Sequence, residues 1–157
     1  MDHTYFKLAH MLASVVFLGN IITELAWMRN AIKRQDIGIL SFTVAGIIKG
    51  DKYFTIPSVV LITSSGVASS VSGHFSTLGN GWILYSIVLF VASGIIFSLR
   101  LVPLQNKICA LAGNKSVFVK SDWVEINKLY RNWNFWGIVA LITPLLAFIM
   151  MTLKIPR

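Results

Sequence analysis

Four long runs of apolar residues constrain the fold of this chain more than any short motif does. They cover about residues 5–28, 54–72, 81–101 and 133–153. Each is close to the ~20 residues that an α-helix needs to cross the hydrocarbon core of a bilayer. Because that core holds no water to satisfy the backbone, each run must be helical. The sequence therefore predicts an all-α, polytopic membrane protein, a four-transmembrane-helix bundle that forms a single domain over residues 1–157.

The composition agrees with a membrane protein. The chain is 55% hydrophobic and 13% charged, with a mean hydropathy of +0.71, whereas a soluble domain is about a quarter charged. The net charge is +8, but the basic residues lie between the apolar runs. The expected partner is therefore the lipid bilayer surface, and no nucleic acid is expected. The single cysteine, Cys109, excludes an intramolecular disulfide and a cysteine-based zinc site.

The positions of the basic residues predict the orientation of the chain. The connections after the first and third runs each carry five lysines and arginines, whereas Gly73–Gly81 carries none. This bias places both long connections in the cytoplasm and both termini in the periplasm of a bacterial inner membrane. Lys7, Lys154 and Arg157 oppose the bias but are fewer.

The two long connections mix bases with apolar residues. The first is expected either to extend helix one into the cytoplasm or to lie on the membrane surface as an amphipathic helix. Trp82, Trp133 and Trp136 lie near the ends of runs, where an aromatic belt is expected. Pro144 is expected to bend the fourth helix without ending it.

A polar stripe follows one face of the first predicted helix. At about 100° per residue its members fall within a narrow arc. They are Lys7, His10, Ser14, Phe17, Ile21 and Glu24. Ionisable groups that face lipid are unfavourable, so the stripe is expected to point into the bundle. Glu24 is expected to pair with a base or a hydroxyl near the cytoplasmic end, and Arg29, Arg100 and Arg131 are the candidate bases.

The stripe and the histidines suggest a cofactor. The second helix runs back toward the N-terminal side, so His74 is expected to emerge on the side where His10 lies. Imidazole is an axial ligand of haem iron and also a ligand of copper. A haem b site would use His10 as the axial ligand and Lys7 as a propionate partner or second ligand. Lys7, His10, Ser14 and His74 are therefore the candidate cofactor-binding residues. In the alternative interpretation, His10 bonds a serine or glutamate, and Lys7 extends to the lipid headgroups.

Copper remains open as a second metal. A free amine with histidine in third place, as in Met1-Asp2-His3, is a square-planar copper(II) arrangement. The candidate metal ligands are therefore His3, His10 and His74.

Small residues recur at close-packing spacing in the second and third runs. They are Ser65, Gly66, Ser69, Ser70 and Gly73 in the second run, and Ser86, Ser93, Gly94 and Ser98 in the third. They predict either close approach of helix backbones or room for a flat ligand.

Several stretches resemble known membrane families. "KLAHMLASVVFLGNIITELAWMRNA", Lys7–Ala31, is similar to the first helix of the HemJ-type protoporphyrinogen oxidases and of the copper-resistance D (CopD-like) membrane proteins. The chain resembles more closely a neighbouring, uncharacterised bacterial family of integral membrane proteins. That likeness rests on "FTIPSVVLITSSG", on Gly81-Trp82, on "LVPLQ", and on the closing pattern from Trp133 to Pro156.

The resemblance implies roles for particular residues. In the HemJ-type proteins the histidine of this motif is a haem b ligand, which implies the same role for His10, with Lys7 beside it. This sequence departs from the HemJ pattern after helix one, because no arginine follows Gly19 at the expected place. The resemblance therefore implies haem binding without the oxidase activity. The copper-resistance relatives imply copper uptake, with Met11, His10 and His3 as sites.

Three functions follow as hypotheses. The first is a haem-b-binding membrane protein with a redox or porphyrin-related role, and the second is a copper-handling membrane protein. The third is a non-catalytic, lipid-embedded accessory subunit whose basic connections meet a cytoplasmic partner. A homo-oligomer or a membrane partner is a further expectation. The sequence shows no nucleophile–base pair, phosphate loop or paired carboxylate, so hydrolysis and phosphoryl transfer are not expected.

Overall fold

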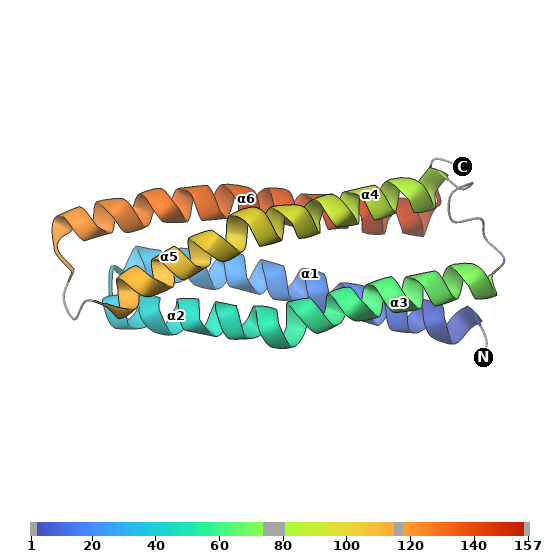
Figure 1. The fold of residues 1–157 in the computed structure, drawn as a ribbon, viewed down its shortest axis with the longest axis horizontal. Helices are drawn as coiled ribbons and strands as arrows, with labels where there is room; N and C mark the ends of the chain where they lie inside the picture. The colour runs from blue at the N-terminus through green and yellow to red at the C-terminus, as the bar shows by residue number, and fades with distance from the viewer. Residues whose placement is uncertain (1–2, 74–80, 115–117, 156–157) are drawn as a thin grey trace.

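Four long helices run antiparallel along one axis in the structure, which is a computed structural model (Figure 1). It describes residues 3–73, 81–114 and 118–155, and all regular secondary structure within them is helical. The second and third long helices each contain a five-residue π-helical segment, and the α-helical parts on either side of that segment are counted with it as one long helix. In chain order the elements are α1 (His3–Arg34), α2 (Ile37–Gly50), η1 (Asp51–Thr55), α3 (Ile56–Ser72), α4 (Gly81–Ile96), η2 (Phe97–Leu101), α5 (Val102–Gly113) and α6 (Lys120–Leu153).

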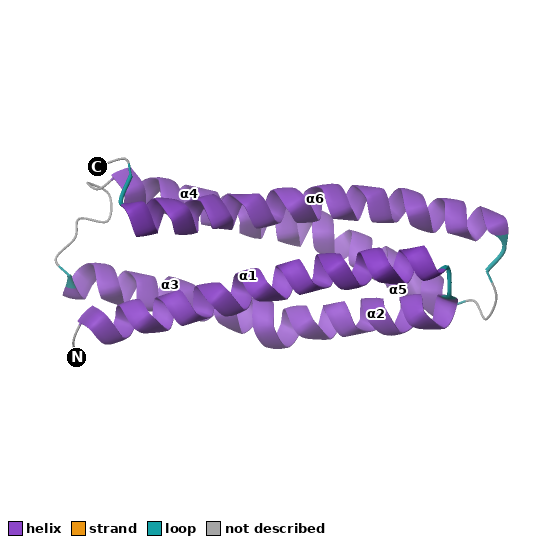
Figure 2. Ribbon diagram, turned by 180° about the vertical axis from the view of Figure 1, so that it is seen from behind, coloured by secondary structure: helices purple, strands orange, loops and turns teal. Residues whose placement is uncertain are grey.

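The predicted all-α architecture is confirmed. Among the described residues, four helices are long and apolar enough to cross a membrane, and both termini lie at the same end of the bundle (Figures 1 and 2).

Both π-helical segments come just before a proline. In η1 the amide of Ile56 donates to the Asp51 carbonyl, and in η2 the amide of Val102 donates to the Phe97 carbonyl. A proline ring clashes with the carbonyl four residues earlier, and the wider π turn relieves that clash. Pro57 and Pro103 therefore change the local winding without ending their helices. Pro144 also lies inside a continuous α6.

The long connections predicted from the sequence are themselves helical. α1 continues to Arg34, and the next helix begins only three residues later, at Ile37. Gln35, with φ of 50°, makes the turn, and the Asp36 carboxylate accepts a hydrogen bond from the Ile39 amide at 2.9 Å. Helix one thus extends as far as Arg34, and most of the rest of this connection forms α2, which packs beside α1.

The bundle is therefore longer than a bilayer. α1 has 32 residues and α6 has 34, so at 1.5 Å per residue each is roughly 50 Å long. The hydrocarbon core is only about 30 Å thick. We call the end that holds both termini the terminal half, formed by 3–24, 56–72, 81–96 and 138–153. The opposite end, formed by 25–50 and the described part of 102–137, is the extended half. The π-helical segments η1 and η2 lie between the two halves.

The extended half holds the larger apolar core. Its buried residues come from all four long helices and include Met28, Leu40, Ile108, Ile126 and Trp133. Its surface carries exposed lysines, arginines and other polar residues among scattered apolar ones. Trp133 is only 2% exposed, so its expected place in an aromatic belt is wrong: the indole packs in the core because α6 extends well beyond it.

The terminal half is held together differently. α1 pairs with α3, and α4 pairs with α6. The small apolar cluster between the pairs consists of Ala13, Phe17 and Ile62. Serines link α4 to α6: the Ser93 hydroxyl donates to the Ala140 carbonyl at 2.8 Å, and Ser86 lies 3.2 Å from the Ala147 carbonyl. The prediction that small residues bring helix backbones together is confirmed for this pair.

Candidate functional site

The polar stripe of α1 points into the bundle over most of its length. Ser14, Phe17 and Glu24 are buried, and His10 is half-buried, as predicted. Lys7 is exposed, so its predicted inward position is wrong. Its long side chain starts one turn from the end of the helix, where an ammonium group reaches water easily.

The His10 ring lies against α3. Its Nδ1 atom is 2.9 Å from the carbonyl oxygen of Ile62. A Cβ on Gly66 would lie 3.1 Å from the same nitrogen, so the absence of a side chain there makes room for the ring. The Ser14 hydroxyl donates to the His10 backbone carbonyl at 2.8 Å and does not contact the ring.

This geometry fixes the tautomer of a neutral His10. A carbonyl oxygen accepts only, so the Nδ1 atom must carry the proton and donate it to Ile62. The Nε2 atom then keeps its lone pair. Histidines that ligate metals commonly have their other nitrogen held in this way by a carbonyl or carboxylate. His10 is therefore a competent single ligand.

The structure does not describe the side chains of the other two predicted histidine ligands. The side chain of His3 and the whole of His74 lie outside the described residues. Within the described residues no group of three or more His, Cys, Asp or Glu side chains is placed to hold a metal ion.

A second polar cluster lies where the two halves meet, and sequence analysis did not assemble it. The Asn20 amide donates to Glu24 Oε1 at 2.6 Å and to the Thr55 hydroxyl at 3.0 Å. Gln105 donates to Asp51 Oδ2 at 3.0 Å. Glu24 and Asp51 lie close enough to interact electrostatically. Helices α1 and α5, together with η1, thus gather two carboxyl groups and their hydrogen-bond partners in one layer.

Glu24 does not have the predicted kind of partner. Its carboxylate takes its hydrogen bond from an amide, Asn20, rather than from a base or hydroxyl. The candidate base Arg100 instead lies over the Trp136 ring, with its guanidinium carbon 5.2 Å from the ring centroid.

The sequence contained one signal for this layer. Asp51 lies between Lys49 and Lys52 in a segment expected to be a cytoplasmic connection. The sequence therefore gives no reason to pair its carboxyl group with that of Glu24. Pro57 follows Asp51 and Thr55 of the layer, and Pro103 comes two residues before Gln105. A proline inside an apolar run is the sequence feature that locates a π turn, and such turns occur often at functional sites.

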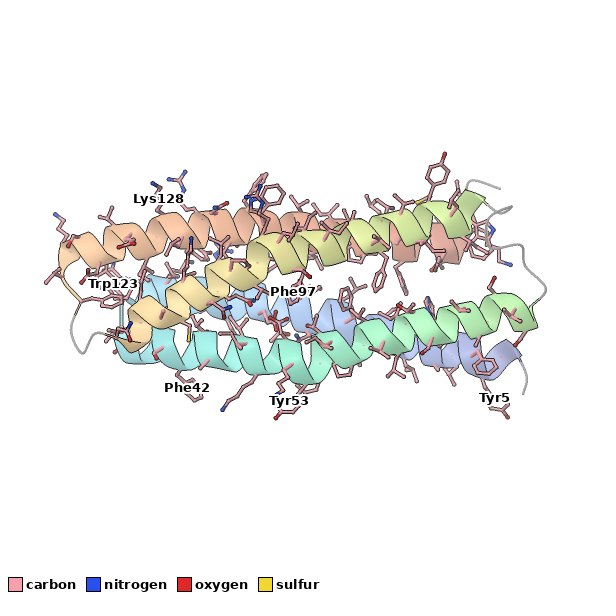
Figure 3. All side chains as sticks on the ribbon, in the orientation of Figure 1. Tyr5, Phe42, Tyr53, Phe97, Trp123 and Lys128 are labelled. Atoms are coloured by element: carbon pink, nitrogen blue, oxygen red, sulfur yellow. The ribbon has the colours of Figure 1, made fainter. Side chains whose placement is uncertain are left out.

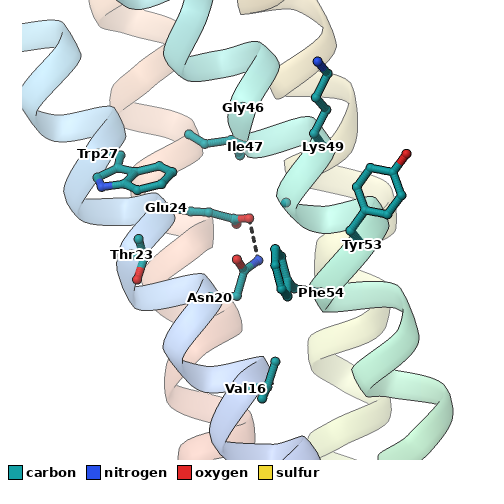
Figure 4. Close-up of a pocket in the computed structure, with 11 residues that line it drawn as sticks. Val16, Asn20, Thr23, Glu24, Trp27, Gly46, Ile47, Lys49, Tyr53 and Phe54 are labelled. Atoms are coloured by element: carbon teal, nitrogen blue, oxygen red, sulfur yellow. Dashed lines mark hydrogen bonds between the residues drawn. The ribbon is translucent and has the colours of Figure 1, made fainter.

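The side chains of the second long helix show which of its faces is free. Phe42 and Tyr53 project away from the bundle (Figure 3), and both are exposed. Asn20, Glu24 and Phe54 lie near one another between α1 and the second long helix (Figure 4). Of the polar layer, Asn20 and Glu24 line a pocket at this surface, whereas Asp51 and Gln105 are buried.

Comparison with known proteins gives one family. No curated protein and no solved structure matches the chain. The model of the family described as predicted integral membrane protein (DUF2269) matches residues 4–155, which include all four long helices. The chain belongs to this family of integral membrane proteins.

Proposed function

We propose that this multi-pass membrane protein binds haem b in its terminal half, with His10 as an axial ligand. The observation that carries the proposal is the hydrogen bond between His10 Nδ1 and the Ile62 carbonyl, because it leaves Nε2 free to bind a metal. The likeness of the first helix to HemJ-type proteins supports the same role. The basic connections support a bacterial inner membrane with both termini periplasmic.

The residues around His10 fit one end of such a group. Lys7 is exposed one turn nearer the helix end, where its ammonium can neutralise a propionate. Gly66 has no side chain and so leaves room for the His10 ring against α3. Bound haem would supply one-electron redox chemistry or a porphyrin to be handled, while this chain supplies the nitrogen, the cation and the apolar walls.

Absorption spectra of the purified protein test the proposal. The wild type, loaded with haem, is expected to show a Soret band that His10→Ala abolishes. Lys7→Ala should weaken haem binding less than His10→Ala, and Lys7→Arg should weaken it least. Lys120→Ala, at the far end of α6, is the matched control and should bind as the wild type does.

Circular dichroism should show His10→Ala to be as helical as the wild type. A wild-type Soret band in a folded His10→Ala protein overturns the proposal. Metal analysis of the same samples tests the copper alternative: loss of copper, rather than haem, in His10→Ala and His3→Ala would favour a copper-handling protein. A wild type that binds neither would favour the accessory-subunit hypothesis.

A further inference from the structure

A groove runs between α1 and the second long helix where the terminal and extended halves meet (Figure 4). Its volume is about 400 Å³. Its floor holds Asn20 and Glu24, and its rim holds Trp27, Lys49, Tyr53 and Phe54. All four rim residues are exposed. The groove therefore opens sideways from the bundle and does not lead into its interior.

The floor of the groove presents an unfilled acceptor. Glu24 is only 6% exposed, and its one hydrogen bond with the described residues comes from Asn20 to Oε1. Glu24 Oε2 has no donor there, although the residue lines the groove. The neighbouring Asp51 is equally buried, and its Oδ1 atom also lacks a hydrogen-bond partner among the described residues. A buried carboxylate that has one donor and no cation is incompletely satisfied, which is unfavourable.

Gly50 keeps the carboxylate in place. A Cβ at this position would lie 3.1 Å from Glu24 Oε1 and 3.5 Å from Asn20 Oδ1. The helix therefore approaches α1 closely and leaves the carboxylate at the floor of the groove.

The rim supplies the complementary charge and an apolar wall. The Lys49 side chain points toward the extended half, away from Glu24, so that the cation and the acid lie at different levels of the groove (Figure 4). Trp27, Tyr53 and Phe54 provide aromatic faces, which attract ammonium groups and are common where a membrane meets water. Toward the terminal half the exposed surface is apolar, with Val16 and Phe54 beside the groove.

We infer that this groove binds the headgroup of an aminophospholipid. The lipid ammonium would bind Glu24 on the floor, and the acyl chains would lie along the apolar surface of the terminal half. Lys49 would attract the phosphate by its charge without contacting it. A lipid, rather than a dissolved amine, is the expected source of the ammonium because the groove opens to the side between the apolar surface of the terminal half and the more polar extended half, where headgroups are expected. The site is separate from His10 and does not depend on haem.

Native mass spectrometry of the protein, released from nanodiscs of equal parts phosphatidylethanolamine and phosphatidylglycerol, tests the inference. The wild type is expected to retain phosphatidylethanolamine about tenfold better than phosphatidylglycerol, the size of one charge-assisted hydrogen bond. Glu24→Gln should lose this preference. Glu125→Gln, which removes an exposed carboxylate of α6 outside the groove, is the matched control and should keep it. Lys49→Gln should weaken retention of both lipids, because both carry a phosphate.

Gly50→Ala is a second variant that shows whether a lost lipid preference reflects the position of Glu24 rather than misfolding. Alanine favours helix more than glycine does, yet its methyl group would displace Glu24, so preference should fall while the charge is unchanged. An unaltered preference in both Glu24→Gln and Gly50→Ala overturns the inference. It is also overturned if dissolved ethanolamine displaces the lipid at equal concentration, because the site would then recognise an amine without its lipid.

Discussion

The two halves of the bundle are built from the same four helices but are stabilised in different ways. In the extended half large side chains such as Met28, Leu40 and Ile108 fill a core, and polar residues cover the outside. In the terminal half the outside is apolar, and serines such as Ser93 bond across the helix pairs. In water, burial of apolar surface drives packing. In lipid that drive is lost, and close contacts and hydrogen bonds replace it.

The comparison predicts that the terminal half lies in lipid and the extended half in water. Cysteine labelling is expected to show the largest difference between the two halves. Val124 in the extended half is 66% exposed and Val88 in the terminal half is 56% exposed. In a Cys109→Ala background, a water-soluble maleimide should label Val124→Cys nearly completely in opened membranes and leave Val88→Cys unlabelled. Equal labelling of the two would break the comparison.

The cysteine variant Val124→Cys also tests the orientation of the chain in the membrane. In intact cells, Val124→Cys should stay unlabelled by an impermeant maleimide, because the basic extended half is expected to lie in the cytoplasm. Labelling before the cells are opened would reverse the proposed orientation.

Truncation of buried isoleucines should come next in size. Ile108→Ala removes a fully buried side chain from the extended core, and such changes lower the free energy of unfolding by about 2–5 kcal/mol. Ile83→Ala, in the terminal half, should lower it by roughly half as much, because its side chain contacts lipid in the unfolded state as well. Denaturant titration of both variants in micelles measures the difference. A larger effect for Ile83→Ala would contradict the assignment of the two halves.

Loss of one interhelical hydrogen bond should have a smaller effect. Ser93→Ala removes the donor to the Ala140 carbonyl and should lower the free energy of unfolding by about 1 kcal/mol. Ser98→Ala, at an exposed position in η2 of the same long helix, is the control and should change little. If both variants unfold alike, hydroxyl bonding does not stabilise the terminal half.

The smallest effect is expected at Trp133. Its indole Nε1 is buried and has no hydrogen-bond partner among the described residues. Trp133→Phe removes this unsatisfied donor and some volume together, so stability should stay within about 1 kcal/mol of the wild type. Trp133→Ala should instead destabilise by about 3–5 kcal/mol. Similar losses in both variants would show that the indole N–H does have a partner.

The sequence by itself determined the number of spans, the helical class and most of the inward stripe of α1. Hydrophobic runs of membrane length have only one way to satisfy their backbone, and residues at helical spacing share a face whatever packs against it. His10, Ser14 and Glu24 could be placed on that face before any partner was known.

Only the tertiary structure decided what those residues meet. The Ile62 carbonyl that holds His10, and the layer that unites Glu24 with Asp51 and Gln105, join segments far apart in the chain. Their meeting depends on the relative height of the helices, which the tight turn after Arg34 and the π turn of η1 set. A shift of one helical turn would leave every sequence pattern intact and separate the two carboxyl groups, so the pattern alone could not reveal the groove.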